Sequence, residues 1–133
     1  MRQIKFRAWD SVRKVMHLNA SKVGESLYWD NGTSYNHMAF IYPKEEGERY
    51  FLMQFTGLQD KNGVGIYEGD IISIQYIRKE YTNSVVCWSN DSALFYTSKE
   101  VGGEGCAISR SHMEEFEVIG NIHENPELLT DNN

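Results

Sequence analysis

The sequence of 133 residues predicts a mainly β protein built from short antiparallel strands, with one short helix near its end. Apolar and polar residues alternate over short stretches, which is the period of a half-buried strand. These stretches recur about every ten residues and are separated by glycine-containing turns. Such regular spacing is typical of β-sandwiches and β-barrels.

The N-terminal part predicts two β-hairpins. In the first, Ile4, Phe6 and Ala8 alternate with charged or aromatic residues, and the polar stretch "DSVRK" leads to a returning strand at "VMHL". In the second, the strand "LYW" is followed by Asn31-Gly32, a pair that accepts the positive φ of tight turns. The stretch "YNHMAFIY" then returns and ends before Pro43.

The middle of the chain contains the densest turn signals. The apolar segment "YFLMQF" (50–55) fits either a strand or a short helix, and Thr56-Gly57 is expected to end it. Asn62-Gly63 predicts a tight turn, and "EGD" (68–70) predicts a bend. The following "IISIQYI" predicts a strand that places Ile72, Ile74 and Tyr76 on one face.

The C-terminal part predicts a hairpin, two further strands and a helical turn. "SVVCWS" and "ALFYTS" flank a turn at Asn90-Asp91, and "GGEG" forms a loop before a short strand at "CAISR". "FEVIGNI" closes the sheet, with a β-bulge at Gly120. A helical turn follows, with Asn125 as its N-cap and Pro126 at its first position.

This order of elements predicts a small SH3-like barrel between residues 66 and 123. We therefore expect an N-terminal β-rich region at 1–55 and a barrel with its helical turn at 56–133, packed as one compact unit.

The charge distribution limits the classes of partner. The net charge is −6, yet residues 1–22 carry a balance of +5 and residues 114–133 a balance of −6. The basic head could contact nucleic acid, but its charges are spread out and the overall acidity repels phosphate. We favour attraction between the two ends, and nucleic acid is not the expected partner. No apolar run reaches the length of a membrane span and no signal peptide is evident, so a cytoplasmic protein is expected.

Four kinds of chemistry can be considered for this chain, and none is favoured. The glycines of "QFTGLQDKNGVGIYEGDIISI" could cradle a phosphate, but the stretch lacks a phosphate-binding motif and carries Glu68 and Asp70. The four histidines lack metal-ligand spacing, so neither a metal nor a cofactor is expected. Cys87 and Cys106 are expected to be buried, unpaired thiols, and Glu68 with Asp70 is too common a spacing to indicate acid–base catalysis. No catalytic residue is therefore assigned.

The three tryptophans, Trp9, Trp29 and Trp88, could form stacking platforms, although a β core of this size needs such residues itself. The candidate binding residues are Trp9, Trp29, Tyr67 and Arg7. The residues expected to be structural are Gly57, Gly63, Gly69, Asp70, Gly120 and Pro126.

Three separated stretches, "IKFRAWD", "QFTGLQDKNGVGIYEGDII" and "FEVIGNIHENPELL", resemble the YopX-like family of bacteriophage and prophage proteins. The resemblance spans nearly the whole chain and implies a small intracellular, mainly β protein with an SH3-type barrel in its C-terminal part. It also implies self-association, and it brings no catalytic residues. We therefore expect a non-enzymatic interaction or assembly module. The alternatives are a nucleic-acid accessory protein and, third, a small enzyme.

Overall fold

A computed structural model describes residues 3–23, 26–30, 37–40, 49–75 and 81–130. The described part of the chain is mainly β, as predicted. It divides into two compact units, Met1–Phe55 and Thr56–Asn133. Among the described residues, no helix is long and apolar enough to cross a membrane.

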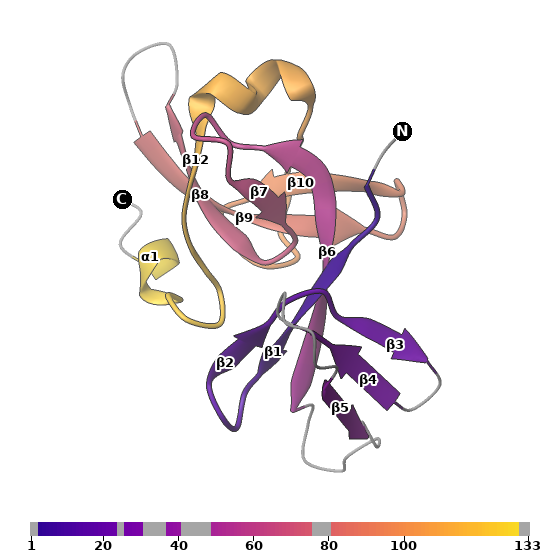
Figure 1. The fold of residues 1–133 in the computed structure, drawn as a ribbon. Coiled ribbons are helices and arrows are strands. Elements are labelled where there is room, and N and C mark those ends of the chain that lie inside the picture. Colours follow the sequence, from indigo (N-terminus) through magenta and orange to yellow (C-terminus); the bar gives the residue numbers. More distant parts are fainter. Residues whose placement is uncertain (1–2, 24–25, 31–36, 41–48, 76–80, 131–133) are drawn as a thin grey trace. The chain divides into compact units, whose positions relative to one another are not determined.

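The first unit contains two small antiparallel arrangements of strands (Figure 1). Strand β1 pairs with β2 and with β6, whereas β4 lies between β3 and β5. Its core is formed by Ala8, Ala20 and Leu27, against which Phe6 and Tyr50 pack. The strands are β1 (Phe6–Asp10), β2 (Val15–His17), β3 (Ser21–Val23), β4 (Ser26–Trp29), β5 (His37–Phe40) and β6 (Tyr50–Gln59), of which β6 continues past Phe55 into the second unit.

Both predicted hairpins of this unit are confirmed. In the first, Ala8 lies opposite His17, and Lys14 closes the turn with a φ of 58°. In the second, Leu27 lies opposite Ala39. The Asn31-Gly32 turn of that hairpin lies outside the described residues.

The second unit is built on a five-stranded antiparallel sheet in the order β11-β10-β9-β8-β12 (Figure 1). The predicted barrel-type architecture is confirmed, in the form of curled sheets that make a half-barrel. Ile66, Ile72, Ile74, Val86 and Phe116 form the buried core. The elements are β7 (Gly65–Tyr67), β8 (Asp70–Gln75), β9 (Tyr81–Ser89), β10 (Leu94–Ser98), β11 (Gly105–Ala107), the 3₁₀ helix η1 (Arg110–Glu115), β12 (Phe116–Asn121) and α1 (Glu127–Thr130).

Residues 50–55, which fitted either a strand or a helix, form a strand, but the expected break at Thr56-Gly57 is wrong. Strand β6 continues to Gln59. Gly57 takes a φ of +89° inside the strand, where its missing side chain avoids strain. The Thr56 hydroxyl donates to the Ile66 carbonyl at 2.7 Å and accepts from the Leu58 N–H at 3.2 Å, so it holds the backbone together across this irregularity.

The isoleucine-rich strand β8 is confirmed, and it is more buried than its alternation of apolar and polar residues predicts. Ile72 and Ile74 share the core face, whereas Ile71, on the opposite face, is also fully buried. Tyr76 lies outside the described residues. The hairpin between β9 and β10 is confirmed, with Phe95 opposite Trp88.

The closing strand and the helix follow the prediction with two corrections. The register of β12 against β8 shifts between Val118 and Gly120, which confirms the bulge. Helix α1 begins at Glu127, one residue after Pro126. The Asn125 side-chain oxygen accepts from the N–H of Asn121 at 3.3 Å, so this side chain binds the preceding strand end and was wrongly expected to cap the helix. The backbone nevertheless agrees with Asn125 as the N-cap position, because its carbonyl accepts the first bond of the helical turn, from the N–H of Leu128 at 3.1 Å.

The segment after β10 departs most from the prediction. The strand expected at 106–110 is wrong in its bounds, because β11 covers only Gly105–Ala107 and η1 starts at Arg110. Gly105 was expected in the loop, yet it lies in the strand. A Cβ at this position would overlap the Thr97 carbonyl oxygen, so glycine alone permits this close approach of two backbones.

Candidate functional site

Strand β11 is one edge of the five-stranded sheet, with a neighbouring strand only on its β10 side within the described part of the chain. All three of its residues are exposed. The N–H of Ile108 donates to the Phe95 carbonyl at 3.2 Å, and Thr97 lies opposite Cys106. Because hydrogen-bonded pairs alternate along an antiparallel ladder, the N–H and C=O groups of Ala107 point away from β10. An edge of this kind can accept another strand.

The opposite edge of the same sheet, β12, is covered by a turn of its own unit. The N–H of Lys61 donates to the Phe116 carbonyl at 3.0 Å. The Asp60 carboxylate accepts from the N–H of Val118 at 2.9 Å, and also from the N–H groups of Asn62 and Val64. This buried carboxylate therefore closes the tight turn and bonds to the N–H of Val118 in β12. An incoming strand can reach the β11 edge of the sheet more easily than the β12 edge.

The connection between β10 and β11 is held by one hydroxyl. The buried Ser98 hydroxyl donates to the Glu104 carbonyl at 2.9 Å, and it accepts from the N–H of Glu100 at 3.4 Å. Gly102 takes a φ of +76° in this connection. A Cβ on Gly103 would lie 2.7 Å from the Glu100 side chain, so glycine lets that side chain fold over the loop.

Two hollows lie beside β11. The first has a volume of about 560 Å³ and a mainly hydroxyl-bearing and charged lining. It is lined by Thr82, Ser84, Thr97, Ser98, Lys99, Glu100, Glu104, Gly105 and Cys106.

The second hollow has a volume of about 520 Å³ and shares Glu104 and Gly105 with the first. Ala107 and Tyr96, which lie opposite one another, contribute to it. Burial raises the pKa of the Tyr96 hydroxyl, and the neighbouring Cys87 raises it further. Its other lining residues are Ser89, Ser92, Leu94 and Gly103.

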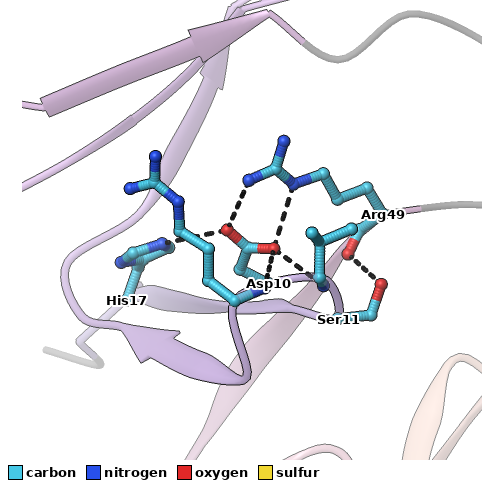
Figure 2. Close-up of polar contacts among 6 residues, drawn as sticks. Asp10, Ser11, His17 and Arg49 are labelled. Carbon is cyan, nitrogen blue, oxygen red and sulfur yellow. Dashed lines mark hydrogen bonds and ion pairs between the residues drawn. The ribbon is translucent and has the colours of Figure 1, made fainter.

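A separate polar cluster in the first unit surrounds the Asp10 carboxylate, which is 1% exposed. Figure 2 shows the Arg49 guanidinium beside it, with Nε 3.0 Å from Oδ1 and Nη2 3.0 Å from Oδ2. The N–H groups of Val12 and Arg13 donate to Oδ1 at 3.0 and 3.1 Å. Burial alone would raise the pKa of Asp10, but the hydrogen bonds from Arg49, Arg13 and Val12 outweigh it and lower this pKa to about 2.

This cluster is suited to holding the fold together. The Ser11 N–H and hydroxyl both donate to the Arg49 carbonyl at 2.8 Å, which ties the first hairpin turn to the residue before β6. His17 Nε2 lies 4.0 Å from Asp10 Oδ2, and its ring stacks on Trp29 with centroids 4.0 Å apart. A carboxylate with a pKa of about 2 is a weak base, so the arrangement does not favour general-base chemistry.

Three of the four candidate binding residues lie in the first unit, and they do not form one exposed surface there. Trp9 is buried at 4% exposure, and Trp29 is half-buried in the stack with His17. The half-buried Arg7 points a guanidinium nitrogen at the Met53 sulfur, 3.9 Å away. Tyr67 is half-buried in the other unit, where its N–H donates to Asp70 at 2.8 Å.

The glycine-rich stretch uses its backbone amides within the fold. Gly57, Gly63 and Gly69 all have positive φ, between 81° and 89°. The N–H of Gly63 donates to the Asp60 carbonyl at 3.0 Å, and that of Gly69 donates to the Val86 carbonyl at 2.8 Å. These donors are therefore not available to an anion.

The structure also shows where the cysteines and the third tryptophan lie. Cys87 is buried as predicted, but the expectation that Cys106 is buried is wrong, because it lies on the exposed edge strand; both thiols are free. No cluster of three or more metal-ligating side chains occurs among the described residues. Trp88 is 42% exposed and packs edge-on against Phe95, with ring centroids 5.0 Å apart.

The exposed edge itself was not predicted from the sequence. Its residues were divided between a loop and a strand, because "GGEG" signals only a turn. The signal that could have found it is Gly105 next to the small residues Cys106 and Ala107, since a glycine inside a strand marks a close approach of backbones.

Comparison with known proteins agrees with this architecture. The crystal structure of protein EF1440 from Enterococcus faecalis superposes with a TM-score of 0.67 at 26% sequence identity, covering 97% of this chain and 99% of that one. No match was found among curated proteins. The profile of the family described as YopX protein matches residues 5–130, which is nearly the whole chain. The chain therefore belongs to the YopX protein family.

Proposed function

We propose that this protein is a non-enzymatic interaction module that takes up an extended segment of another protein as an additional strand along β11. One observation carries the proposal: an exposed strand edge lies between two hollows, while the other edge of the same sheet is covered. In strand addition, main-chain hydrogen bonds supply affinity and pockets for alternate side chains supply specificity.

The geometry suits an extended segment better than a helix. Successive side chains of a strand point to opposite faces of the sheet, so neighbouring residues of an added strand would enter different hollows. Thr97 and Cys106 line the first hollow, whereas Tyr96 and Ala107 line the second. These are adjacent cross-strand pairs, and adjacent pairs face opposite sides of the sheet.

An enzyme is not favoured, because the buried carboxylates of the described residues already serve the fold. Asp10 holds a hairpin turn, Asp60 covers β12, and Asp70 accepts from the N–H of Tyr67. We place the protein in the bacterial cytoplasm, encoded by a phage or prophage. Support for this setting comes from the family resemblance and from the bacterial source of the similar structure.

Three of the described basic residues do not favour the nucleic-acid alternative. The Lys5 ammonium lies 4.5 Å over the Phe55 ring, Arg7 contacts Met53, and Arg49 pairs with Asp10. The Asp10 carboxylate neutralises the Arg49 charge that a phosphate would need, and the other two contacts hold Lys5 and Arg7 against groups of their own unit. Attraction between the basic head and the acidic tail stays a prediction.

The test is a selection of randomised ten-residue peptides displayed against the purified protein, followed by calorimetry of the enriched peptides. The key variant is Ala107→Pro, which removes an outward N–H that the sheet itself does not use. We expect peptide affinity to fall at least tenfold while the melting temperature changes little. Ala107→Ser keeps the N–H and changes only the side chain in the second hollow, so it should lose much less affinity than Ala107→Pro.

Three outcomes would contradict the proposal. A selection that yields no binding peptides would show that β11 does not bind an extended segment. Enriched peptides that bind Ala107→Pro as tightly as the wild type would show the same. The third outcome is a dimer of the purified protein that Ala107→Pro dissociates. That result would show the occupant to be a second copy of the chain.

A further inference from the structure

The first hollow beside β11 carries more negative than positive charge. Glu100 and Glu104 line it together with Lys99, and all three residues are exposed. The whole chain is also acidic, with a net charge of −6. A segment with a positive side chain would therefore bind in this hollow more favourably than a segment with a negative side chain.

Two of the four hydroxyl groups that line this hollow add a second constraint. The Thr97 hydroxyl donates to the Cys106 carbonyl at 3.5 Å, and the Ser98 hydroxyl donates to the Glu104 carbonyl at 2.9 Å. A hydroxyl has only one proton to donate, so both groups offer a ligand only lone pairs. The carboxylates of Glu100 and Glu104 are likewise acceptors when ionised. The ligand group that matches the lone pairs of Thr97, Ser98, Glu100 and Glu104 is a donor without acceptors.

Lysine and arginine are the side chains whose polar groups only donate and whose charge is positive. We propose that the segment taken up along β11 carries a lysine or arginine whose side chain occupies the hollow of Thr97, Ser98, Glu100 and Glu104. This inference rests on the proposed function and names the chemistry of its partner. The residue next to the basic one faces the second hollow, where Leu94, Tyr96 and Ala107 favour an apolar side chain.

The experiment uses peptides enriched in the display selection, each compared with a matched peptide in which its lysine or arginine is replaced by glutamine. Binding is measured by calorimetry to the wild-type protein and to three charge variants. We expect Glu104→Gln and Glu100→Gln each to weaken the basic peptide about two- to fivefold, since exposed charge pairs are individually weak. Lys99→Gln is the matched control, and it should strengthen the same peptide. The glutamine peptide should respond to none of the three.

The outcomes distinguish a failure of this charge assignment from a failure of the proposed strand addition. If enriched peptides lose affinity in Ala107→Pro but carry no basic residue, strand addition stands and the charge assignment is overturned. The charge assignment is overturned in the same way if Lys99→Gln and Glu104→Gln change affinity in the same direction. If no peptide binds at all, the proposed function fails as well.

Discussion

Asp10 and Arg49 form a two-point ion pair across 39 positions of the chain, with both nitrogen–oxygen distances at 3.0 Å. The pair lies where the first hairpin turn meets the residue that precedes β6, and only the aspartate is fully buried. A planar guanidinium matches a carboxylate at two points, which a lysine could not do. The geometry explains why a buried acid is tolerated here.

Asp10 should make the stability of the protein sensitive to strong acid. Its folded-state pKa is about 2, below the ordinary value of 3.8, so the unfolded chain binds the proton more readily. The stabilisation is therefore complete above about pH 4 and is lost as the pH falls toward 2. The measurement is the urea midpoint at intervals across this window. Asp10→Asn should be less stable at neutral pH and should show a shallower fall in acid; a slope identical to that of the wild type would contradict the assignment.

Gly57 and Gly69 should resist replacement by a β-branched residue. Both have a φ near +90°, so Gly57→Val or Gly69→Val should cost on the order of 1–3 kcal/mol of stability or cause aggregation. The control is Gly65→Ala in the same stretch, because Gly65 lies in β7 and has no positive φ. A valine variant with an unchanged melting temperature that nevertheless loses peptide binding would show that the stretch is a binding site.

Asp60→Ala should destabilise the second unit and uncover its closed edge. Three N–H groups, from Asn62, Val64 and Val118, lose their acceptor, and each buried unsatisfied donor costs about 1–3 kcal/mol where water cannot reach it. Chemical denaturation measures the loss, and light scattering detects self-association through β12. Asp60→Asn keeps one acceptor oxygen and should be milder. Equal stability of Asp60→Ala and wild type would show that this carboxylate does not close the edge.

Nucleic acid should bind poorly. In fluorescence-anisotropy titrations with mixed-sequence DNA and RNA, single- and double-stranded, we expect no dissociation constant tighter than roughly 10⁻⁴ M at physiological salt. The described cations Lys5, Arg7 and Arg49 already contact Phe55, Met53 and Asp10. Micromolar binding that falls steeply with salt and disappears in an Arg2, Lys5 and Arg7 triple alanine variant would put the nucleic-acid function first.

Local patterns predicted most of the strands because each rests on interactions close in sequence. Alternation located β1, and the turn pair Asn90-Asp91 located the β9–β10 hairpin, since a short turn brings neighbouring strands together by itself. The break expected at Thr56-Gly57 failed because a contact ten residues away decided it. The Thr56 hydroxyl bonds to Ile66 in β7, and this bond carries the strand through its irregularity.

The sequence by itself determined the mainly β class, the two N-terminal hairpins and the β9–β10 hairpin, the barrel-type C-terminal part and membership of the YopX protein family. These features could be predicted because the alternation of apolar residues and the backbone conformation of glycine each depend on only a few neighbouring residues. Only the tertiary structure decided which sheet edge is covered and which is open. Asp60 reaches Val118 across 58 positions, and the backbone of Gly105 comes close to that of Thr97. The contact between Asp60 and Val118 leaves no local trace, because it depends on where folding brings two distant segments; Gly105 leaves only the weak signal of a glycine next to small residues.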